Sequence, residues 1–466
     1  MTTEDRLADF DVTGDDIELV NEKALTWFDV SAIGTGEMLF TAGWAWIIYV
    51  AASYGTKWLL IGFIGGAAVI HLAWWLYREM ITAVPEPGSL QSFAREAGMF
   101  SVGTTYFVGY TAIYGAFLWL ELITAKGLLS AFLPDVPSWI WPFAIIAPIV
   151  GINLLGHQIT GKFQSVLVVI TLIGDVALAG LFWHLLADKQ TWAANWESPS
   201  PVNFMTPFAV TGMWIGVMAG IMEVQQVLVD EWSDFDKCRD VGLLSAAWQL
   251  WVREVPLALG LLAAAPVAAL ALMPVPAVQV VHDKLGQHPV FYLAIAMMLV
   301  ATFTTISVYF MAMSKVLALY AQQGALPRVV GQYSTRSVPW VAILILAAFA
   351  LAGSFFTNFD FIVDVLSEWS ATLYFVVALF FLGMRRRKDL DRPVVAAFGV
   401  PVAYIILVVT ALVAVSVFLR NWQAGVVWYG ACGAFIAYDH YIVPRTQRGG
   451  FYRAQVLRRR TSAVRL

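Results

Sequence analysis

Carboxylates that stand inside long apolar runs are the residues of this sequence best suited to chemistry. Glu37 follows the Gly-Thr-Gly sequence at 34–36, and Glu223 follows Gly220. A carboxylate at the centre of a membrane helix costs at least ~2.5–3.5 kcal/mol, so each should face a cavity or a positively charged partner. Glu37 therefore predicts the binding of a cationic group, and Glu223 could bind the substrate directly. The alternatives are a structural carboxylate bonded to backbone for Glu37 and a structural or gating role for Glu223.

Further ionisable residues stand inside the apolar runs. Asp175, Asp364 and Glu368 could bind a proton or a cation, or they could mark an aqueous vestibule. Arg253 and Glu254 are neighbours that point to different faces of a helix, so they need not pair with each other. We expect Arg253 to extend its side chain to the cytoplasmic surface, as long basic side chains do near membrane interfaces.

Familiar catalytic patterns are absent from the sequence. It contains no HExxH metal-binding pair, no GxSxG nucleophile turn and no GxxxxGK[ST] phosphate loop. The two cysteines, Cys238 and Cys432, belong to no CxxC or Cys/His cluster. We therefore expect no enzyme, no cofactor, no nucleic-acid partner and no direct use of ATP. A pore ring or a filter-like carbonyl loop, which would indicate a channel, is missing as well.

The composition indicates that this chain is embedded in a lipid bilayer. Of 466 residues, 60% are hydrophobic and 13% are charged, against roughly 45–50% and 25% in an ordinary soluble domain. A helix needs about 20 apolar residues to cross about 30 Å of hydrocarbon. Twelve runs qualify, near 29–54, 58–80, 100–124, 139–157, 162–186, 205–228, 243–272, 290–318, 338–357, 360–383, 396–419 and 424–443.

Lysine and arginine are distributed unevenly between the two sides that twelve spans would define. If the N-terminus lies inside, 22 of the 28 basic residues border the cytoplasm, five border the outside and Arg253 lies within a span. Because basic residues are enriched on the cytoplasmic side, we expect both termini inside the cell and a multi-pass protein of the cell membrane. The first 29 residues carry nine carboxylates, and the last 24 carry seven arginines that suit anionic lipid.

Two of the spans contain glycines that could interrupt a helix. The first span holds Gly34 and Gly36, and the sixth holds Gly212, Gly216 and Gly220. Inside a membrane, non-helical backbone is tolerated only where protein or water shields it, so a broken span indicates a binding site. Because spans one and six are five apart, the pattern predicts two inverted five-helix repeats. The alternative is that these glycines only allow close packing of helices.

Several short motifs resemble, in their order along the chain, those of the amino acid–polyamine–organocation permeases. The likeness runs over most of residues 29–345. Its motifs are Gly34-Thr35-Gly36, Glu79 with the segment 85–96, Asn153 with Gly156, the segment 220–223 with Asp230-Glu231, and Ser314-Lys315 with the segment 323–327. The chain departs from the family pattern in two places. One residue is inserted at 220–223, and Glu37 stands where the family has an apolar residue.

The resemblance implies an all-α polytopic membrane protein with twelve transmembrane helices. Its core would be a leucine-transporter-like pair of inverted five-helix repeats, followed by two C-terminal helices. The implied organisation is an acidic cytoplasmic tail over 1–28, a ten-helix core over 29–383 with repeats at about 29–186 and 205–383, helices 11 and 12 over 396–443, and a basic cytoplasmic tail over 444–466. We expect a monomer or a homodimer.

The resemblance also implies a secondary transporter that imports a small amine-containing solute by alternating access, with an amino acid as the first expectation. A transporter or exchanger of a cationic amine, a polyamine or a betaine-like solute is the alternative, and Glu37 shifts weight towards it. In such folds the broken first helix offers N–H groups to a substrate carboxylate, and the broken sixth helix offers carbonyls to an ammonium. The residues expected around the substrate are Gly34, Thr35, Gly36, Glu37, Trp214, Val217, Gly220, Glu223 and Trp369.

Some of these residues have ordinary alternatives. The Thr35 hydroxyl could donate to the substrate, or it could bond to the preceding carbonyl of its own helix. Trp214 and Trp369 could form aromatic lids, although most of the 20 tryptophans should belong to interfacial belts or packing.

The coupling ion is expected to be sodium or a proton. Many relatives carry a lysine in the fifth helix that occupies the space of a sodium ion, and Thr171 stands at that position here. In this fold a sodium site uses first-helix carbonyls and two hydroxyls of the eighth helix, for which Thr304 and Thr305 are the candidates. Hydroxyl packing between helices and proton use through Glu37, Asp175 or Glu223 remain as alternatives.

Overall fold

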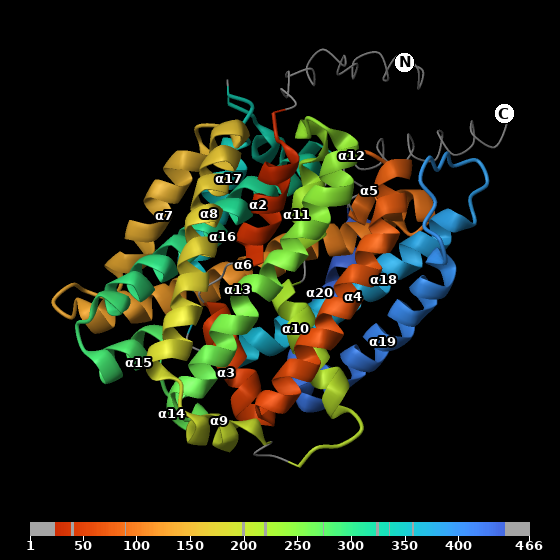
Figure 1. The fold of residues 1–466 in the computed structure, drawn as a ribbon. Coiled ribbons are helices and arrows are strands. Elements are labelled where there is room, and N and C mark those ends of the chain that lie inside the picture. The colour runs from red at the N-terminus through yellow and green to blue at the C-terminus, as the bar shows by residue number, and fades with distance from the viewer. Residues whose placement is uncertain are drawn as a thin grey trace.

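The computed structural model describes residues 24–38, 42–88, 90–197, 201–218, 221–273, 275–322, 326–334, 336–356 and 358–442. Over these ranges the chain folds into helices, and its extended backbone is limited to one isolated bridge between Leu25 and Trp232. The long helices run alongside one another in a single bundle (Figure 1). The protein is therefore an all-helical polytopic membrane protein.

The helices differ widely in length. The longer ones are α2 (Trp27–Met38), α3 (Ala42–Tyr54), α4 (Thr56–Ala83), α6 (Phe100–Phe132), α7 (Ile140–Asn153), α8 (His157–Leu181), α10 (Thr206–Met218), α13 (Leu243–Ala264), α16 (Pro289–Gln322), α17 (Trp340–Gly353), α18 (Phe359–Arg385), α19 (Gly399–Arg420) and α20 (Trp422–Ala437). The shorter ones are α5 (Leu90–Ala97), α9 (Lys189–Trp196), α11 (Ile221–Val227), α12 (Phe235–Lys237), α14 (Val267–Leu270) and α15 (Pro276–Leu285), and 3-10 or π turns lie at 182–186, 229–231, 238–242, 328–331 and 438–442.

Each of the twelve expected runs contains a helix, but the helices are not equally suited to span a bilayer. Seven helical stretches in the described ranges are long and apolar enough to cross a membrane. In contrast, α7 and α17 have 14 residues each, which is about 21 Å at 1.5 Å per residue. The runs 139–157 and 338–357 are therefore shorter as helices than expected. A turn at Gly156, with φ of 120°, separates α7 from α8, and α17 begins only after Pro339.

The interruptions expected in spans one and six fall partly outside the described residues. In the first span the described residues belong to α2 up to Met38 and to α3 from Ala42, and in the sixth they belong to α10 up to Met218 and to α11 from Ile221. The position expected for the first interruption was wrong, because Gly34-Thr35-Gly36 is helical and lies inside α2. Neighbouring helices approach these two glycines closely, so their missing side chains serve packing within an intact helix.

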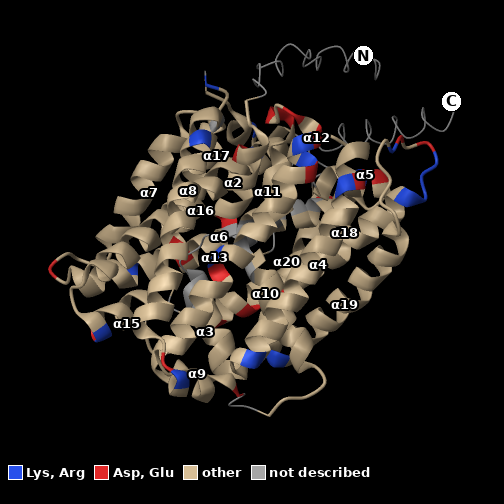
Figure 2. Cartoon of the chain, in the orientation of Figure 1, with Lys and Arg blue, Asp and Glu red and all other residues tan. Residues whose placement is uncertain are grey.

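Charged residues gather at the two ends of the bundle, and few lie between them (Figure 2). The short helices α9, α14 and α15 lie at one end, and α5 and α12 lie at the other (Figure 1). The segments of α9 and α15 were expected outside the cell and those of α5 and α12 inside, whereas α14 lies within the run 243–272 that was expected to be the seventh span. The two ends of the bundle thus separate α9 and α15 from α5 and α12.

Candidate functional site

Two glutamine side chains press against the glycines of α2. A Cβ added at Gly34 would lie 2.5 Å from Nε2 of Gln225, and one added at Gly36 would lie 1.7 Å from Nε2 of Gln164. Gln225 belongs to α11 and Gln164 to α8, and both are fully buried. Only glycine at these two positions leaves room for the amides.

The Thr35 hydroxyl bonds to the protein itself. It lies 2.8 Å from the carbonyl oxygen of Ser31, one turn earlier, and 2.7 Å from Oε1 of Gln249 on α13. Gln249 in turn donates from Nε2 to the hydroxyl of Ser31 at 2.8 Å, and Ser245 donates to the same hydroxyl at 2.7 Å. The second of the two alternatives for Thr35 is therefore the one observed, and its hydroxyl fixes α2 against α13.

Glu37 and Glu223, the carboxylate pair, are both buried and close enough for the charge of Glu223 to act on Glu37. Glu223 accepts a short hydrogen bond from the Tyr77 hydroxyl through Oε1. Its Oε2 atom and Oε2 of Glu37 have no hydrogen-bond partner among the described residues. Two buried carboxyl groups with open acceptor oxygens can receive a cationic group or a proton.

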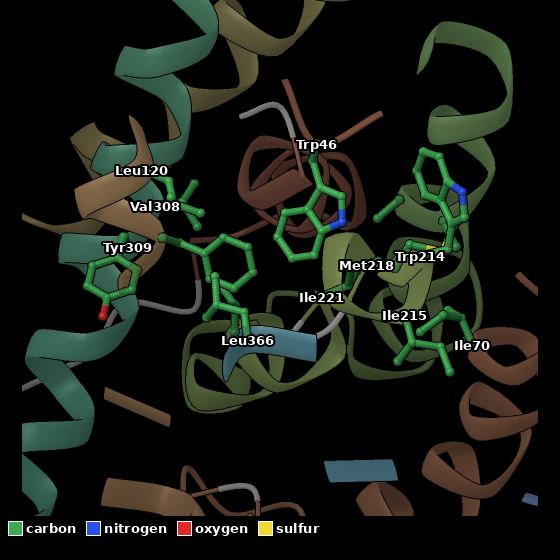
Figure 3. Close-up of a cluster of buried hydrophobic side chains, with 14 of the residues drawn as sticks. Trp46, Ile70, Leu120, Trp214, Ile215, Met218, Ile221, Val308, Tyr309 and Leu366 are labelled. Carbon is green, nitrogen blue, oxygen red and sulfur yellow. The ribbon is translucent and has the colours of Figure 1, made fainter. Parts of the chain in front are cut away.

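Trp214 lies on the side of α10 that faces α4. Its ring stacks on Phe63, with centroids 3.4 Å apart, and its side chain fills the space beside Gly62 and Gly66. Figure 3 shows it together with Ile70 and Ile215, apart from Trp46. Trp214 is thus a packing residue in this arrangement.

Of the remaining residues expected around the substrate, the structure describes Trp369 in full but not Gly220 or the side chain of Val217. Trp369 is fully buried on α18, a helix that packs against α10. The sequence did not single out Trp46, whose ring lies 2.8 Å from the position of a Cβ on Gly216 and stacks on Phe117.

The two hydroxyls expected to bind sodium behave differently. Thr305 donates through Oγ1 to the carbonyl oxygen of Gly36 at 2.9 Å, which joins α16 to α2. Thr304 donates to the carbonyl oxygen of Ala301 in its own helix at 2.6 Å. Among the described residues, no group of three or more His, Cys, Asp or Glu side chains could hold a metal ion. Only Thr305 of the expected pair therefore lies beside a first-helix carbonyl.

Asp175, Arg253 and Glu254 form a buried triad between α8 and α13. Arg253 Nη1 lies 2.9 Å from Asp175 Oδ2, and Arg253 Nη2 lies 2.5 Å from Glu254 Oε1. The expectation that Arg253 reaches the cytoplasmic surface was wrong, since the residue is only 2% exposed. The neighbouring carboxylates hold its guanidinium inside the bundle, and α13 brings Glu254 to the same cation despite its different helical position.

Two of the sequence motifs meet at the end of the bundle where α2 begins. Lys315 on α16 lies 2.6 Å from Asp230 Oδ1 and 2.9 Å from Glu231 Oε1. The N–H group of Leu25 donates to the carbonyl of Glu231 at 3.0 Å. The acidic pair after the sixth span therefore links the start of α2 to α16.

Comparison with known proteins identifies relatives along most of the chain. A family model described as amino acid permease matches residues 25–436. The lysine-specific permease LysP of Lactococcus lactis is 24% identical over 449 residues, covering 86% of this chain and 85% of that protein. The gamma-aminobutyric acid permease of Escherichia coli is 23% identical over 351 residues, covering 70% and 73%. The cadaverine/lysine antiporter of Escherichia coli is 28% identical over 166 residues, covering 33% and 32%.

Proposed function

The chain belongs to the amino acid permease family, and from that premise we propose that it imports a small amine-containing solute, an amino acid in the first place, by ion-coupled alternating access. Family membership makes the protein a transporter of amino acids or amines and not an enzyme. The observation that carries the finer proposal is the carboxylate pair, Glu37 and Glu223, buried where α2 meets α11.

The carboxylate pair supports recognition of the amine group of the substrate. An ammonium placed between the open Oε2 atoms would balance the negative charge of the carboxylates and donate hydrogen bonds to their oxygens. Gln164 is buried with both ends of its amide unpartnered among the described residues, and it borders Gly36 directly. Its Nε2 is a donor suited to the carboxylate of an amino acid.

A substrate with no carboxylate is the second candidate. Two acidic side chains exceed what one ammonium of a zwitterion requires, so a cationic amine, a polyamine or a betaine-like solute would suit the site as well. Cadaverine, for which the cadaverine/lysine antiporter reported above is named, is an amine of this kind. Exchange of one such solute for another belongs to this second candidate.

Sodium is the proposed coupling ion, and a proton is the alternative. Support for sodium is limited to Thr305, whose hydroxyl and the Gly36 carbonyl bring two oxygen ligands together at 2.9 Å. Thr304 would have to give up its bond to Ala301 in order to join them.

The proposed architecture is the inverted repeat with a core over 29–383, followed by 396–443. The two 14-residue helices α7 and α17, in spans four and nine, support it. They recur at an offset of five spans, as an inverted pair of five-helix repeats requires. We place the protein in the cell membrane with both termini in the cytoplasm, as a monomer or a homodimer.

Replacement of Glu37 tests the proposed role of the carboxylate pair. We expect Glu37→Gln to lower the affinity for cationic solutes more than for zwitterionic amino acids, because one of the two negative charges is removed. Competition by an amino acid and amine panel against uptake into proteoliposomes measures this. Glu79→Gln is the matched control, since Glu79 is equally buried but paired with Arg385 at 2.6 Å. Unchanged selectivity in Glu37→Gln would make Glu37 structural.

A further inference from the structure

The buried triad holds more negative than positive charge. Asp175, Arg253 and Glu254 are each at most 2% exposed, and two carboxylates face one guanidinium. In the described part of the chain, other bases that pair with two acids lie in clusters more open to water. The side chain of Asp230 beside Lys315 is 27% exposed, and that of Asp236 beside Arg239 is 80% exposed. An uncompensated charge in so dry a place is strongly destabilising, so the triad needs one more positive charge.

The open atoms of the triad show where that charge would bind. Asp175 Oδ1 and Glu254 Oε2 have no hydrogen-bond partner in the described part of the chain. Among the described residues, Arg253 is the cation that forms ion pairs with Asp175 and with Glu254. A metal cation needs several oxygen ligands to replace its hydration shell, whereas a proton needs one lone pair. The two free oxygens therefore suit a proton.

The helices of the triad are also those that hold α2. Asp175 and Gln164 are eleven residues apart, about three turns, so they share one face of α8. Arg253 and Gln249 are four residues apart and share one face of α13. Gln164 contacts Gly36 and Gln249 bonds to Thr35. The triad therefore lies between α8 and α13, and both of these helices pack against α2 at the candidate substrate site.

We propose that Asp175, Arg253 and Glu254 form a binding site for one proton that is taken up and released during transport, in addition to the sodium ion proposed above. A proton delivered through water forms an O–H bond on Asp175 or Glu254 and leaves the triad neutral. Its release returns the triad to a single negative charge and changes the attraction between α8 and α13. The site shares no residue with the carboxylate pair or with Thr305.

Infrared spectroscopy of the purified protein tests proton binding without transport. We expect the absorption of one protonated carboxyl group to be lost in Asp175→Asn and, separately, in Glu254→Gln, because each variant leaves Arg253 with a single carboxylate. Both variants are charge-balanced, so either one that folds suffices. Glu79→Gln, which removes a buried carboxylate paired one-to-one with Arg385, should retain the absorption. An unchanged carboxyl absorption in the triad variants would overturn the proposal.

Transport measurements test whether the proton is exchanged, and this arm rests on the proposed function. Uptake by the wild type should increase under an inward proton gradient, and both triad variants should lose that stimulation while they still exchange labelled for unlabelled solute. Full stimulation in the variants would overturn the proposal. If the wild type carries no member of the panel, the proposed function fails, and the infrared result still decides whether the triad binds a proton.

Discussion

Substitution of Gly36 by alanine tests the close contact between α2 and α8. The added Cβ would lie 1.7 Å from Nε2 of Gln164 and 3.1 Å from Cγ2 of Val308, against 3.4–4 Å for ordinary contact. The amide must therefore retreat by roughly half of an ordinary contact distance, and Gln164 is fully buried, so no solvent is available to receive it. Overpacking of this kind costs about 1–3 kcal/mol. We expect Gly36→Ala to lose both stability and transport.

A double-mutant cycle separates this contact from other effects. Gln164→Ala removes the amide that clashes, so the double variant should recover stability relative to Gly36→Ala, as measured by thermal unfolding in detergent. Gly180→Ala is the matched control, because Gly180 also lies in a long helix, α8, and a Cβ there would meet nothing within 4 Å. The reasoning would be refuted if Gly36→Ala were as stable as Gly180→Ala, or if Gln164→Ala gave no recovery.

Three further predictions follow from single contacts. Thr305→Val should reduce sodium-dependent initial uptake more than Thr304→Val, because only Thr305 donates to the α2 backbone; equal effects would argue against the sodium site. Lys315→Met should lower the free energy of unfolding by about 1–3 kcal/mol, since it removes the ammonium that bonds to both Asp230 and Glu231; wild-type stability would show that these contacts are dispensable. A hydrogen bond from Arg239 lowers the pKa of Asp240 from 3.8 to about 2, so its stabilisation is present above pH 3.8 and is lost as the pH falls through about 2. Asp240→Asn should therefore unfold earlier than the wild type near neutral pH but not below pH 2.

Composition and hydropathy were sufficient to predict the helical membrane fold, because apolar runs of this length have few other stable forms in lipid. The helix boundaries were harder to predict. Hydropathy does not distinguish a helix from the apolar turn that follows it, so the runs at 139–157 and 338–357 read longer than α7 and α17.

The candidate site was predicted in part. Glu37 and Glu223 were identified because a carboxylate in an apolar run is costly and conspicuous. Gln164, Gln225 and Gln249 were missed, since a neutral amide disturbs hydropathy less, although their presence inside apolar runs was a signal that could have been used. The glycines at 34 and 36 suggested a broken helix. In the structure they instead leave room for the side chains of Gln225 and Gln164.

Arg253 shows why sequence distance misled the prediction of ion pairs. Its partner Asp175 lies 78 positions away on another helix, and no local pattern connects the two. Adjacent residues on a helix point about 100° apart, so Glu254 was not expected to pair with Arg253. The long guanidinium bridges that angle and contacts both carboxylates.

The most direct test of the proposed function is uptake of labelled amino acids and amines by proteoliposomes that contain the purified protein, compared with empty liposomes. Import of at least one amino acid or cationic amine, inhibited by the same unlabelled solute, is the result that the carboxylate pair and the family predict. If no amine-containing solute of the panel is taken up, competes or binds, the assignment of an amine substrate is contradicted.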